Sequence, residues 1–284
     1  MKRFISFICI FFILLSSCSK TNKQIWYLEK INSKKLLENE KEKDIKIAIL
    51  DSGFNHNFNI LFENGTIEYG YDFIDQDNFP IAEYNLHGTY ISYLISGMRN
   101  SIYNGIDSRL TLEEIRIFDE SGNTSQELVK QGIQYAIDIG CQVINISFGS
   151  FNYDTEIAKL IENHNEIYFV CAVGDNENKE KFLFPSSLET TISVCAVDEE
   201  NKLYSSSNFL KKETIKAPGV NLEIPTINSK KELVYTKVSG SSYATALVSG
   251  IIGSALMTNS LNTNNLIENT LYSSGYLDCN KFII

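Results

Sequence analysis

Residues 45–53 read Ile-Lys-Ile-Ala-Ile-Leu-Asp-Ser-Gly, and this stretch decides the fold. Its almost continuous apolar run predicts a β-strand that is buried on both faces, as strands of parallel sheets are. Asp51 and the Ser-Gly that follows indicate a turn where the strand ends. Because sites in open parallel sheets form at the carboxyl ends of the strands, Asp51 is a candidate functional residue. An Asp that only caps a turn has the same local pattern.

Strand-like and helical segments alternate along the rest of the chain. The apolar patterns predict strands over residues 115–118, 142–147, 166–173 and 191–197, and helices over 126–139, 154–163 and 243–257. Gly140 is expected to end the first of these helices. The alternation predicts one α/β domain over residues 44–284, a three-layer doubly wound sandwich with a mainly parallel central sheet.

Composition narrows the class of protein. The 284 residues are 43% hydrophobic, which is enough for a sizeable core, and the formal net charge is −10. An acidic chain is a poor partner for nucleic acid, so none is expected. Cys171 and Cys195 lie in apolar runs and are predicted to pack in the core. No cysteine has a partner at zinc-ligand spacing, and the sequence leaves disulfide pairing open.

The first residues have the pattern of an export signal. Lys2 and Arg3 precede the apolar run 4–15, which is shorter than the roughly 20 residues of a membrane span. The following Leu15-Ser-Ser-Cys18 resembles the bacterial lipoprotein signal, which implies cleavage of residues 1–17 and a lipid on Cys18. The expected location is the extracytoplasmic face of the bacterial cell membrane. An ordinary signal with a chance cysteine is the alternative.

Residues 18–43 are predicted to be a polar tether and an N-terminal arm. Trp26 and Leu28 are its expected apolar anchors, and the arm has room for one helix. Because only about 25 residues separate Cys18 from the first predicted strand, we expect no folding prodomain within this stretch.

Two further segments contain candidate functional residues. His87 precedes Gly-Thr and an apolar helical stretch at 90–95, and the chain has only three histidines. Ser242 follows Gly240-Ser241 where a helix is expected to start, so free backbone N–H groups and the positive end of the helix dipole favour an oxyanion there. Each segment alone has a plain structural explanation, such as a core histidine or a helix N-cap serine.

Taken together, the order Asp, His, Ser is the order of the subtilisin triad. The segments 47–53, 87–89 and 240–245 resemble the Asp, His and nucleophile motifs of the subtilase family of serine peptidases. Residues 143–149 and Ala-Pro-Gly at 217–219 are also similar to that family. The resemblance, from about residue 26 to the end, implies a subtilisin-like fold and three roles. Ser242 is the nucleophile, His87 the general base and acid, and Asp51 the group that orients His87.

The resemblance also implies a substrate-binding site. The residues that would line it are Ser147, Phe148, Gly149, Ala172, Val173 and Gly174. Residues 147–149 would pair with an extended peptide as an added strand. Calcium sites are common in the family, but none can be placed in this sequence. Asp72, Asp75 and Asp77 are more readily explained as a solvated loop, and no cofactor is expected.

One position departs from the family. Where subtilases have an oxyanion-binding Asn, this chain has Asp175, and an ionised carboxylate cannot donate a hydrogen bond. Three explanations stay open: Asp175 is protonated and donates, Asn176 takes its place, or the enzyme is slow or inactive. The nucleophile motif also has Tyr243 where the family usually has Met.

The predicted function is therefore serine-type endopeptidase activity on peptides or proteins outside the cell membrane. A dedicated role in removing peptide leaders and general scavenging are two candidate roles. The alternative from a different class is a catalytically impaired, subtilase-fold lipoprotein that binds peptides.

Overall fold

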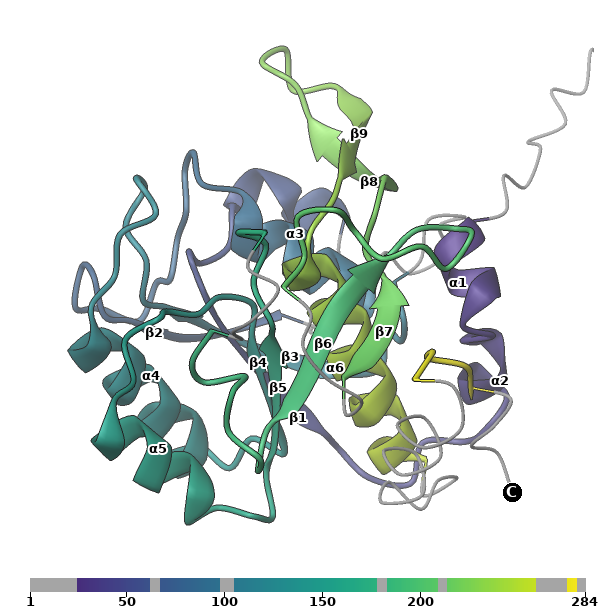
Figure 1. Ribbon diagram of the computed structural model, residues 1–284. Helices are drawn as coiled ribbons and strands as arrows, with labels where there is room; N and C mark the ends of the chain where they lie inside the picture. Colours follow the sequence, from purple (N-terminus) through teal and green to yellow (C-terminus); the bar gives the residue numbers. More distant parts are fainter. Residues whose placement is uncertain are drawn as a thin grey trace, which may run out of the picture.

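A seven-stranded sheet forms the centre of the molecule in the computed structural model (Figure 1), which describes residues 25–61, 67–97, 105–177, 183–208, 214–258 and 275–279. The strand order is β2-β3-β1-β4-β5-β6-β7, and each neighbouring pair is parallel. The strands are β1 (Lys46–Asp51), β2 (Ile67–Asp72), β3 (Thr111–Arg116), β4 (Val143–Ile146), β5 (Tyr168–Ala172), β6 (Ile192–Val197) and β7 (Ile215–Pro218). This sheet confirms the predicted α/β class.

Helices cover both faces of the sheet. One face packs against α3 (His87–Ser96) and α6 (Ser241–Met257), and the other packs against α4 (Gln126–Asp138) and α5 (Thr155–Glu162) (Figure 1). The side chains of β1 alternate between the two layers: Ile47 and Ile49 join the core under α3 and α6, whereas Ala48 and Leu50 join the core under α4 and α5. Both faces of the strand are buried, which explains why its sequence is an apolar run.

Local signals set the ends of the two helices on the α4–α5 face. The Ser125 side chain accepts a hydrogen bond from Leu128 N at the start of α4, and Asp154 accepts from Glu156 N and Ile157 N at the start of α5. Gly140, at φ +76°, follows the end of α4. The predicted helices over 126–139 and 154–163 are thus confirmed to within a residue at each end.

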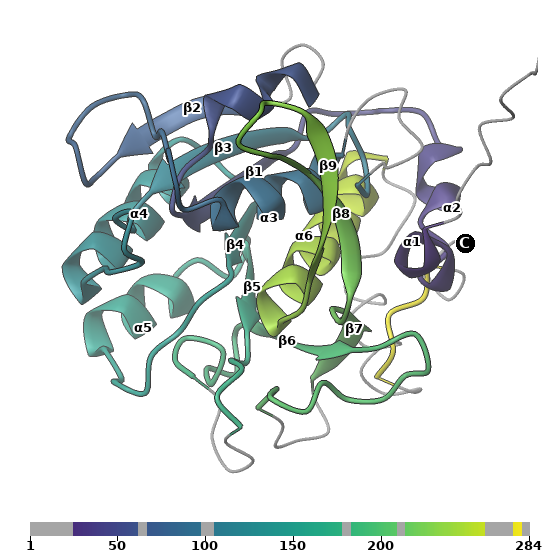
Figure 2. The same ribbon diagram turned by 90° about the horizontal axis from the view of Figure 1, so that it is seen from above.

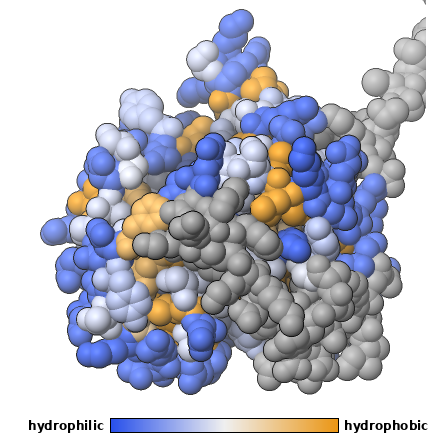
Figure 3. Space-filling model, viewed as in Figure 1, coloured by the Kyte–Doolittle hydropathy of each residue, from blue (hydrophilic) through white to orange (hydrophobic). Residues whose placement is uncertain are grey.

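A two-stranded antiparallel hairpin, β8 (Leu222–Ile227) and β9 (Leu233–Val238), projects from the body and leads into α6 (Figure 1). Seen from above, it lies beside α3 and α6 (Figure 2), and Tyr90 of α3 contacts Thr226 of β8 through their hydroxyls at 2.9 Å. The short 3₁₀ helix η1 (His56–Leu61) follows β1. On the face seen in Figure 3, hydrophobic residues form small areas separated by hydrophilic ones.

Three predicted elements need correction. The strand expected over 115–118 is β3, which begins four residues earlier and ends at Arg116. Its first four residues, Thr-Leu-Glu-Glu, do not have an apolar strand pattern, because the two Glu side chains are buried in spite of their polarity. Helix α6 begins at Ser241, two residues before its predicted start. The solvated loop expected at Asp72 is wrong for that residue, because its carboxylate is buried against Arg116 at 2.8 Å.

The N-terminal arm contains two short helices instead of one, α1 (Trp26–Lys30) and α2 (Lys34–Leu37). Its fully buried side chains are Tyr27, Ile31 and Leu36, whereas the predicted anchors Trp26 and Leu28 are only partly buried. The arm from residue 25 onward therefore packs on the α3–α6 core. The signal segment and Cys18 lie outside the described residues.

The cysteine prediction is confirmed for Cys171 and Cys195. Both are fully buried free thiols, and Cys141 is a free thiol that is 2% exposed. Burial raises the pKa of Cys195 to about 12, so its thiol stays uncharged. Within the described part of the chain, no helix has both the length and the apolar character that a membrane span requires.

Candidate active site

Asp51 is the last residue of β1, which places its side chain at the carboxyl edge of the sheet. The residue is 3% exposed, and Ser52 N donates to Asp51 Oδ1 at 2.7 Å. After β1 the chain continues to β2 and β3 on one side of that strand, whereas after β4, its neighbour on the other side, the chain continues to β5 in the opposite direction. Asp51 therefore lies at the topological switch point, where doubly wound folds place their sites.

His87 is the first residue of α3, and its imidazole lies against Asp51. His87 Nδ1 is 2.9 Å from each carboxyl oxygen of Asp51. Burial lowers the pKa of His87, but the charge of Asp51 and its hydrogen bond outweigh burial, so the net shift is upward from the usual value. With Nδ1 donating to Asp51, Nε2 of the neutral ring is left as the basic nitrogen.

Gly88 explains why a glycine follows the histidine. A Cβ at this position would lie 2.5 Å from Gly53 O and 3.1 Å from Asp51 Cβ. Any larger residue would push the start of α3 away from the end of β1. The glycine therefore allows the close approach that brings His87 to Asp51.

Ser242 is the second residue of α6. Its backbone N–H is among the first four of the helix, which have no partner within the helix. The Ser242 hydroxyl donates to Ser147 O at 2.7 Å, and Ser147 Oγ donates back to Ser242 O at 3.1 Å. These bonds fix the start of α6 beside the end of β4. A hydrogen bond from the Ser242 hydroxyl to His87, as the predicted roles need, would require a rotation of the Ser242 side chain. Catalytic hydrogen bonds commonly form fully only when substrate binds.

Tyr243 lies beside the histidine, as its place next to Ser242 predicts. The ring centroids of His87 and Tyr243 are 5.6 Å apart. Burial is the main cause that raises the pKa of Tyr243 to about 12, so the phenol is neutral at ordinary pH. The tyrosine forms one wall next to the imidazole and narrows the space there.

Asp175 lies beside α6, three residues after β5. Its Oδ2 accepts hydrogen bonds from Ser241 N at 2.7 Å and Ser241 Oγ at 2.9 Å. The residue as a whole is exposed, but partial desolvation of its carboxyl group raises the pKa of Asp175 against the opposing effect of the two bonds. Ser241 adjoins Ser242, so the predicted oxyanion residue lies against the start of the helix that carries Ser242. Asn176 is exposed, and it has no such contact among the described residues.

The segments predicted to bind substrate follow adjacent strands. Residues 147–149 come directly after β4, and residues 173–174 come directly after β5, whose last residue is Ala172. Phe148 packs edge-on against Phe118, with centroids 4.9 Å apart. The structure therefore brings the predicted segments together at the same edge of the sheet as Asp51.

Sequence reasoning missed a buried polar group near Ser242. Asn145 is fully buried in β4, where its Nδ2 donates to Ser147 Oγ at 2.8 Å and its Oδ1 accepts from Ser249 Oγ at 2.9 Å. The signal was present, because an Asn within the apolar run 143–146 needs partners when it is buried. Asn145 thus ties α6 to the end of β4.

Glu114 was also missed. It is fully buried in β3, opposite Ile49 of β1, and its Oε1 is hydrogen-bonded to Ser92 of α3. Burial is the main cause that raises the pKa of Glu114 to about 8, with the nearby charge of Asp51 acting in the same direction. The side chain is therefore mostly protonated at neutral pH, which avoids a second negative charge under the Asp51–His87 pair.

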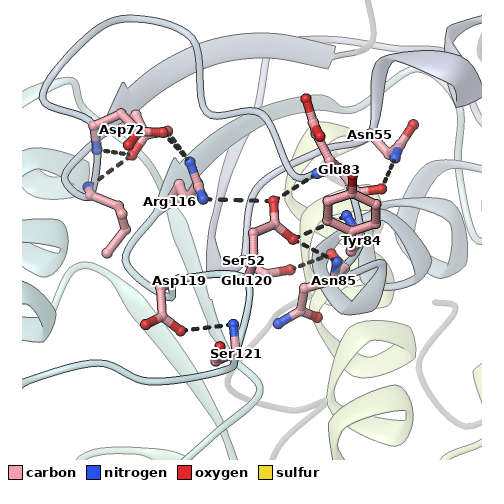
Figure 4. Close-up of polar contacts among 12 residues, drawn as sticks. Ser52, Asn55, Asp72, Glu83, Tyr84, Asn85, Arg116, Asp119, Glu120 and Ser121 are labelled. Atoms are coloured by element: carbon pink, nitrogen blue, oxygen red, sulfur yellow. Dashed lines mark hydrogen bonds and ion pairs between the residues drawn. The ribbon is translucent and has the colours of Figure 1, made fainter.

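Arg116, the last residue of β3, forms ion pairs with the buried Asp72 (Figure 4) and with the exposed Asp75. Arg116 NH1 is 2.8 Å from Asp72 Oδ2 and 2.6 Å from Asp75 Oδ2. Two of the three carboxylates that were predicted to be a solvated loop, Asp72 and Asp75, thus have a protein cation as their partner. Among the residues that the structure describes, no group of three or more His, Cys, Asp or Glu side chains could hold a metal ion.

The arrangement has the class features of a serine hydrolase on a doubly wound α/β sheet: an Asp–His pair at a strand end and a serine in the first turn of a facing helix. The chain matches the model of the subtilase family over residues 42–275, and it belongs to that family.

Known relatives include several serine proteases. The chain is 29% identical to halolysin of Haloferax mediterranei over 81% of its own length and 46% of the halolysin. It is 30% identical to the thermophilic serine proteinase of Bacillus sp. strain AK1, over 72% and 50% of the two chains. It is also 30% identical to the major intracellular serine protease of Bacillus subtilis, over 75% and 68%. The match thus spans about half the length of the first two relatives.

Proposed function

We propose that this chain is a serine endopeptidase that hydrolyses peptide bonds with the triad Asp51, His87 and Ser242. The main supporting observation is the contact of His87 Nδ1 with both carboxyl oxygens of Asp51 at 2.9 Å, at the edge of the sheet where α6 presents Ser242. Membership of the subtilase family and the serine-protease relatives support the same activity.

In the proposed mechanism, Ser242 attacks the scissile carbonyl after its hydroxyl rotates from Ser147 O towards His87 Nε2. His87 accepts the hydroxyl proton and then gives it to the leaving amine, while Asp51 stabilises the imidazolium. The Ser242 N–H donates to the oxyanion, and protonated Asp175 supplies the second donor. Water then hydrolyses the acyl-enzyme through the same groups.

The test is fluorophosphonate labelling of the purified protein from residue 19 onward, with Ser242→Ala as the control. Labelling of the wild type that is absent from the variant supports an activated Ser242. If a well-folded wild type is not labelled, the result favours the alternative function, a protein that binds peptides without cleaving them. Asp175 and the bond of Ser242 to Ser147 are the observations that favour it.

We further propose that the protein acts on the extracytoplasmic face of the bacterial membrane, held by a lipid on Cys18. The Leu-Ser-Ser-Cys sequence at residues 15–18 supports this. Metabolic labelling with radioactive palmitate in a bacterial host is the measurement. The wild type should incorporate label, and Cys18→Ser should not; equal incorporation would show that Cys18 is not the attachment site.

The residue before the cleaved bond is expected to be small. The Leu183 side chain contacts both segments that we propose as pocket walls: a Cβ at Gly149 would lie 2.6 Å from Leu183 Cβ, and a Cβ at Gly174 would lie 2.5 Å from Leu183 Cδ1. Backbone bonds between Phe184 and Ser150, at 2.7 and 2.9 Å, hold the leucine in place. The space between the two walls is therefore partly filled by Leu183.

Leu183→Gly should open this space. For peptides with Phe before the cleaved bond, kcat/KM should rise by about 10- to 100-fold, because a pocket that admits several more methylene groups gains that much discrimination. Peptides with Ala at the same position should be cleaved by both proteins at similar rates, which provides the control. A wild type that already cleaves Phe peptides as well as Ala peptides would contradict this assignment.

A further inference from the structure

Glu120 binds the backbone of the segment that leads into His87 (Figure 4). Glu83 N donates to its Oε1 at 2.7 Å, while Tyr84 N and Asn85 N donate to its Oε2 at 3.0 and 2.8 Å. Residues 83–85 belong to no helix or strand, so their N–H groups have no partner from regular structure. One carboxylate thus satisfies three consecutive backbone donors, the last of them two residues before His87.

The same segment is joined to the Asp51 side of the site. Ser52 Oγ donates to Asn85 O at 3.0 Å, and Gly88 N donates to Ser52 Oγ at 3.1 Å. The Asn85 side chain also accepts from His87 N at 3.3 Å. Because Ser52 adjoins Asp51 and Gly88 adjoins His87, these bonds connect the fixed backbone of Asn85 to both members of the Asp51–His87 pair.

Glu120 is itself held in place and charged. Arg116 NH2 is 3.7 Å from Glu120 Oε1 (Figure 4). Arg116 is anchored at the end of β3 by its ion pairs with Asp72 and Asp75. Burial raises the pKa of Glu120, but the three N–H bonds and the positive charge of Arg116 outweigh it, so the net shift is downward. An ionised carboxylate is the form that accepts three hydrogen bonds well.

We infer that Glu120 is a positioning residue for the catalytic histidine: its carboxylate fixes residues 83–85 on the end of β3, and so fixes His87 against Asp51. β3 pairs with β1, and Arg116 lies opposite Asp51 in that pairing. His87, the proposed base, and Asp51, which orients it, are thereby both held in place by the paired strands β1 and β3. This inference rests on the proposed function, because it concerns the same Asp51–His87 pair.

The test compares Glu120→Ala with Asp119→Ala. Asp119 is the neighbouring carboxylate, and its hydrogen bonds go to its own turn, from Ser121 N and Asn123 N at 2.9 and 2.8 Å. Both variants lose one negative charge from the same loop, but only Glu120→Ala releases residues 83–85. We expect kcat to fall by about 10²-fold in Glu120→Ala with KM nearly unchanged, because a small misplacement of a catalytic group costs about that much. Asp119→Ala should keep the wild-type kcat.

A second readout does not depend on activity. Three histidines make the ¹⁵N-histidine NMR spectrum simple to assign. The pKa of His87, raised in the wild type by Asp51, should fall in Glu120→Ala and stay at the wild-type value in Asp119→Ala. Glu120→Gln, which keeps the side-chain volume and one acceptor oxygen, should lie between the wild type and Glu120→Ala, with kcat lowered by about 10-fold. It replaces Glu120→Ala if that variant does not fold.

The outcomes separate the two claims. A folded Glu120 variant with wild-type kcat and wild-type His87 pKa overturns the positioning role while leaving the peptidase assignment intact. A wild type that cleaves no peptide, with a His87 pKa that still falls in Glu120→Ala alone, keeps the positioning role and removes the peptidase assignment. Equal effects of the Ala substitutions at 119 and 120 would show that Glu120 acts only through its negative charge, and would also overturn the inference.

Discussion

Ser242→Ala should lower kcat for peptide hydrolysis by about 10⁶-fold, the loss that removal of the nucleophile causes in subtilisin, a member of the same family. The reason is that no other group of the site can form the acyl-enzyme. KM should change little, because the segments proposed to bind substrate, residues 147–149 and 172–174, are untouched. The measurement is steady-state hydrolysis of a fluorogenic peptide, with folding checked by circular dichroism.

His87→Ala should cause a loss of similar size, and the double variant should be no slower than either single variant. Groups that act as one unit are strongly non-additive, because removal of the base already leaves the nucleophile inactive. Multiplicative losses in the double variant would show that His87 and Ser242 act separately, and the triad assignment would then be wrong. Wild-type rates in either single variant would have the same consequence.

Asp175→Asn should make the enzyme at least as active as the wild type, and up to about 10²–10³-fold more active, which is the contribution of one oxyanion donor. Asp175 can donate to an oxyanion only when it is protonated, whereas the Asn amide donates at every pH. The Asn oxygen can still accept the two bonds from Ser241, which are 2.7 and 2.9 Å long in the wild type. The start of α6 should therefore be unchanged.

The pH profile is the more specific readout. His87 is active when neutral, so activity rises as pH increases through its pKa, which is raised above the usual value. Asp175 is active when protonated, so activity falls as pH increases through its pKa, which is also raised. The wild type should therefore have a bell-shaped profile. Asp175→Asn should keep the rising limb and lose the falling one.

Asp175→Ala is the matched control, because it removes the donor and also the acceptor for Ser241. It should be less active than both the wild type and Asp175→Asn. If Asp175→Asn is slower than the wild type, or keeps the same falling limb, Asp175 does not donate to the oxyanion. A wild type that is not labelled by fluorophosphonate, together with a labelled Asp175→Asn, would identify Asp175 as the cause of impairment.

The sequence by itself determined the architecture. The apolar run of residues 45–50 is buried on both faces because the strand lies at the centre of a parallel sheet, and burial on both faces leaves no polar alternation. Helix ends were equally local, since Ser125, Asp154 and Gly140 act through bonds or dihedral angles of their own segment. The same holds for the assignment of Asp51, His87 and Ser242: their motifs are short, and their order along the chain predicts the roles proposed for them.

Only the tertiary structure decided what surrounds these residues. Glu113 and Glu114 prevented the recognition of the first four residues of β3 from the sequence, because ionisable side chains in an apolar strand are explained only by partners far away in sequence: Lys46 for Glu113 and Ser92 for Glu114. Glu120 is 35 residues or more from the N–H groups whose hydrogen bonds it accepts. Leu183 is nine residues from Gly174 but 34 from Gly149, the two walls that it contacts. Such pairings depend on which strand ends meet at the edge of the sheet, and periodicity and local motifs hold no information about that.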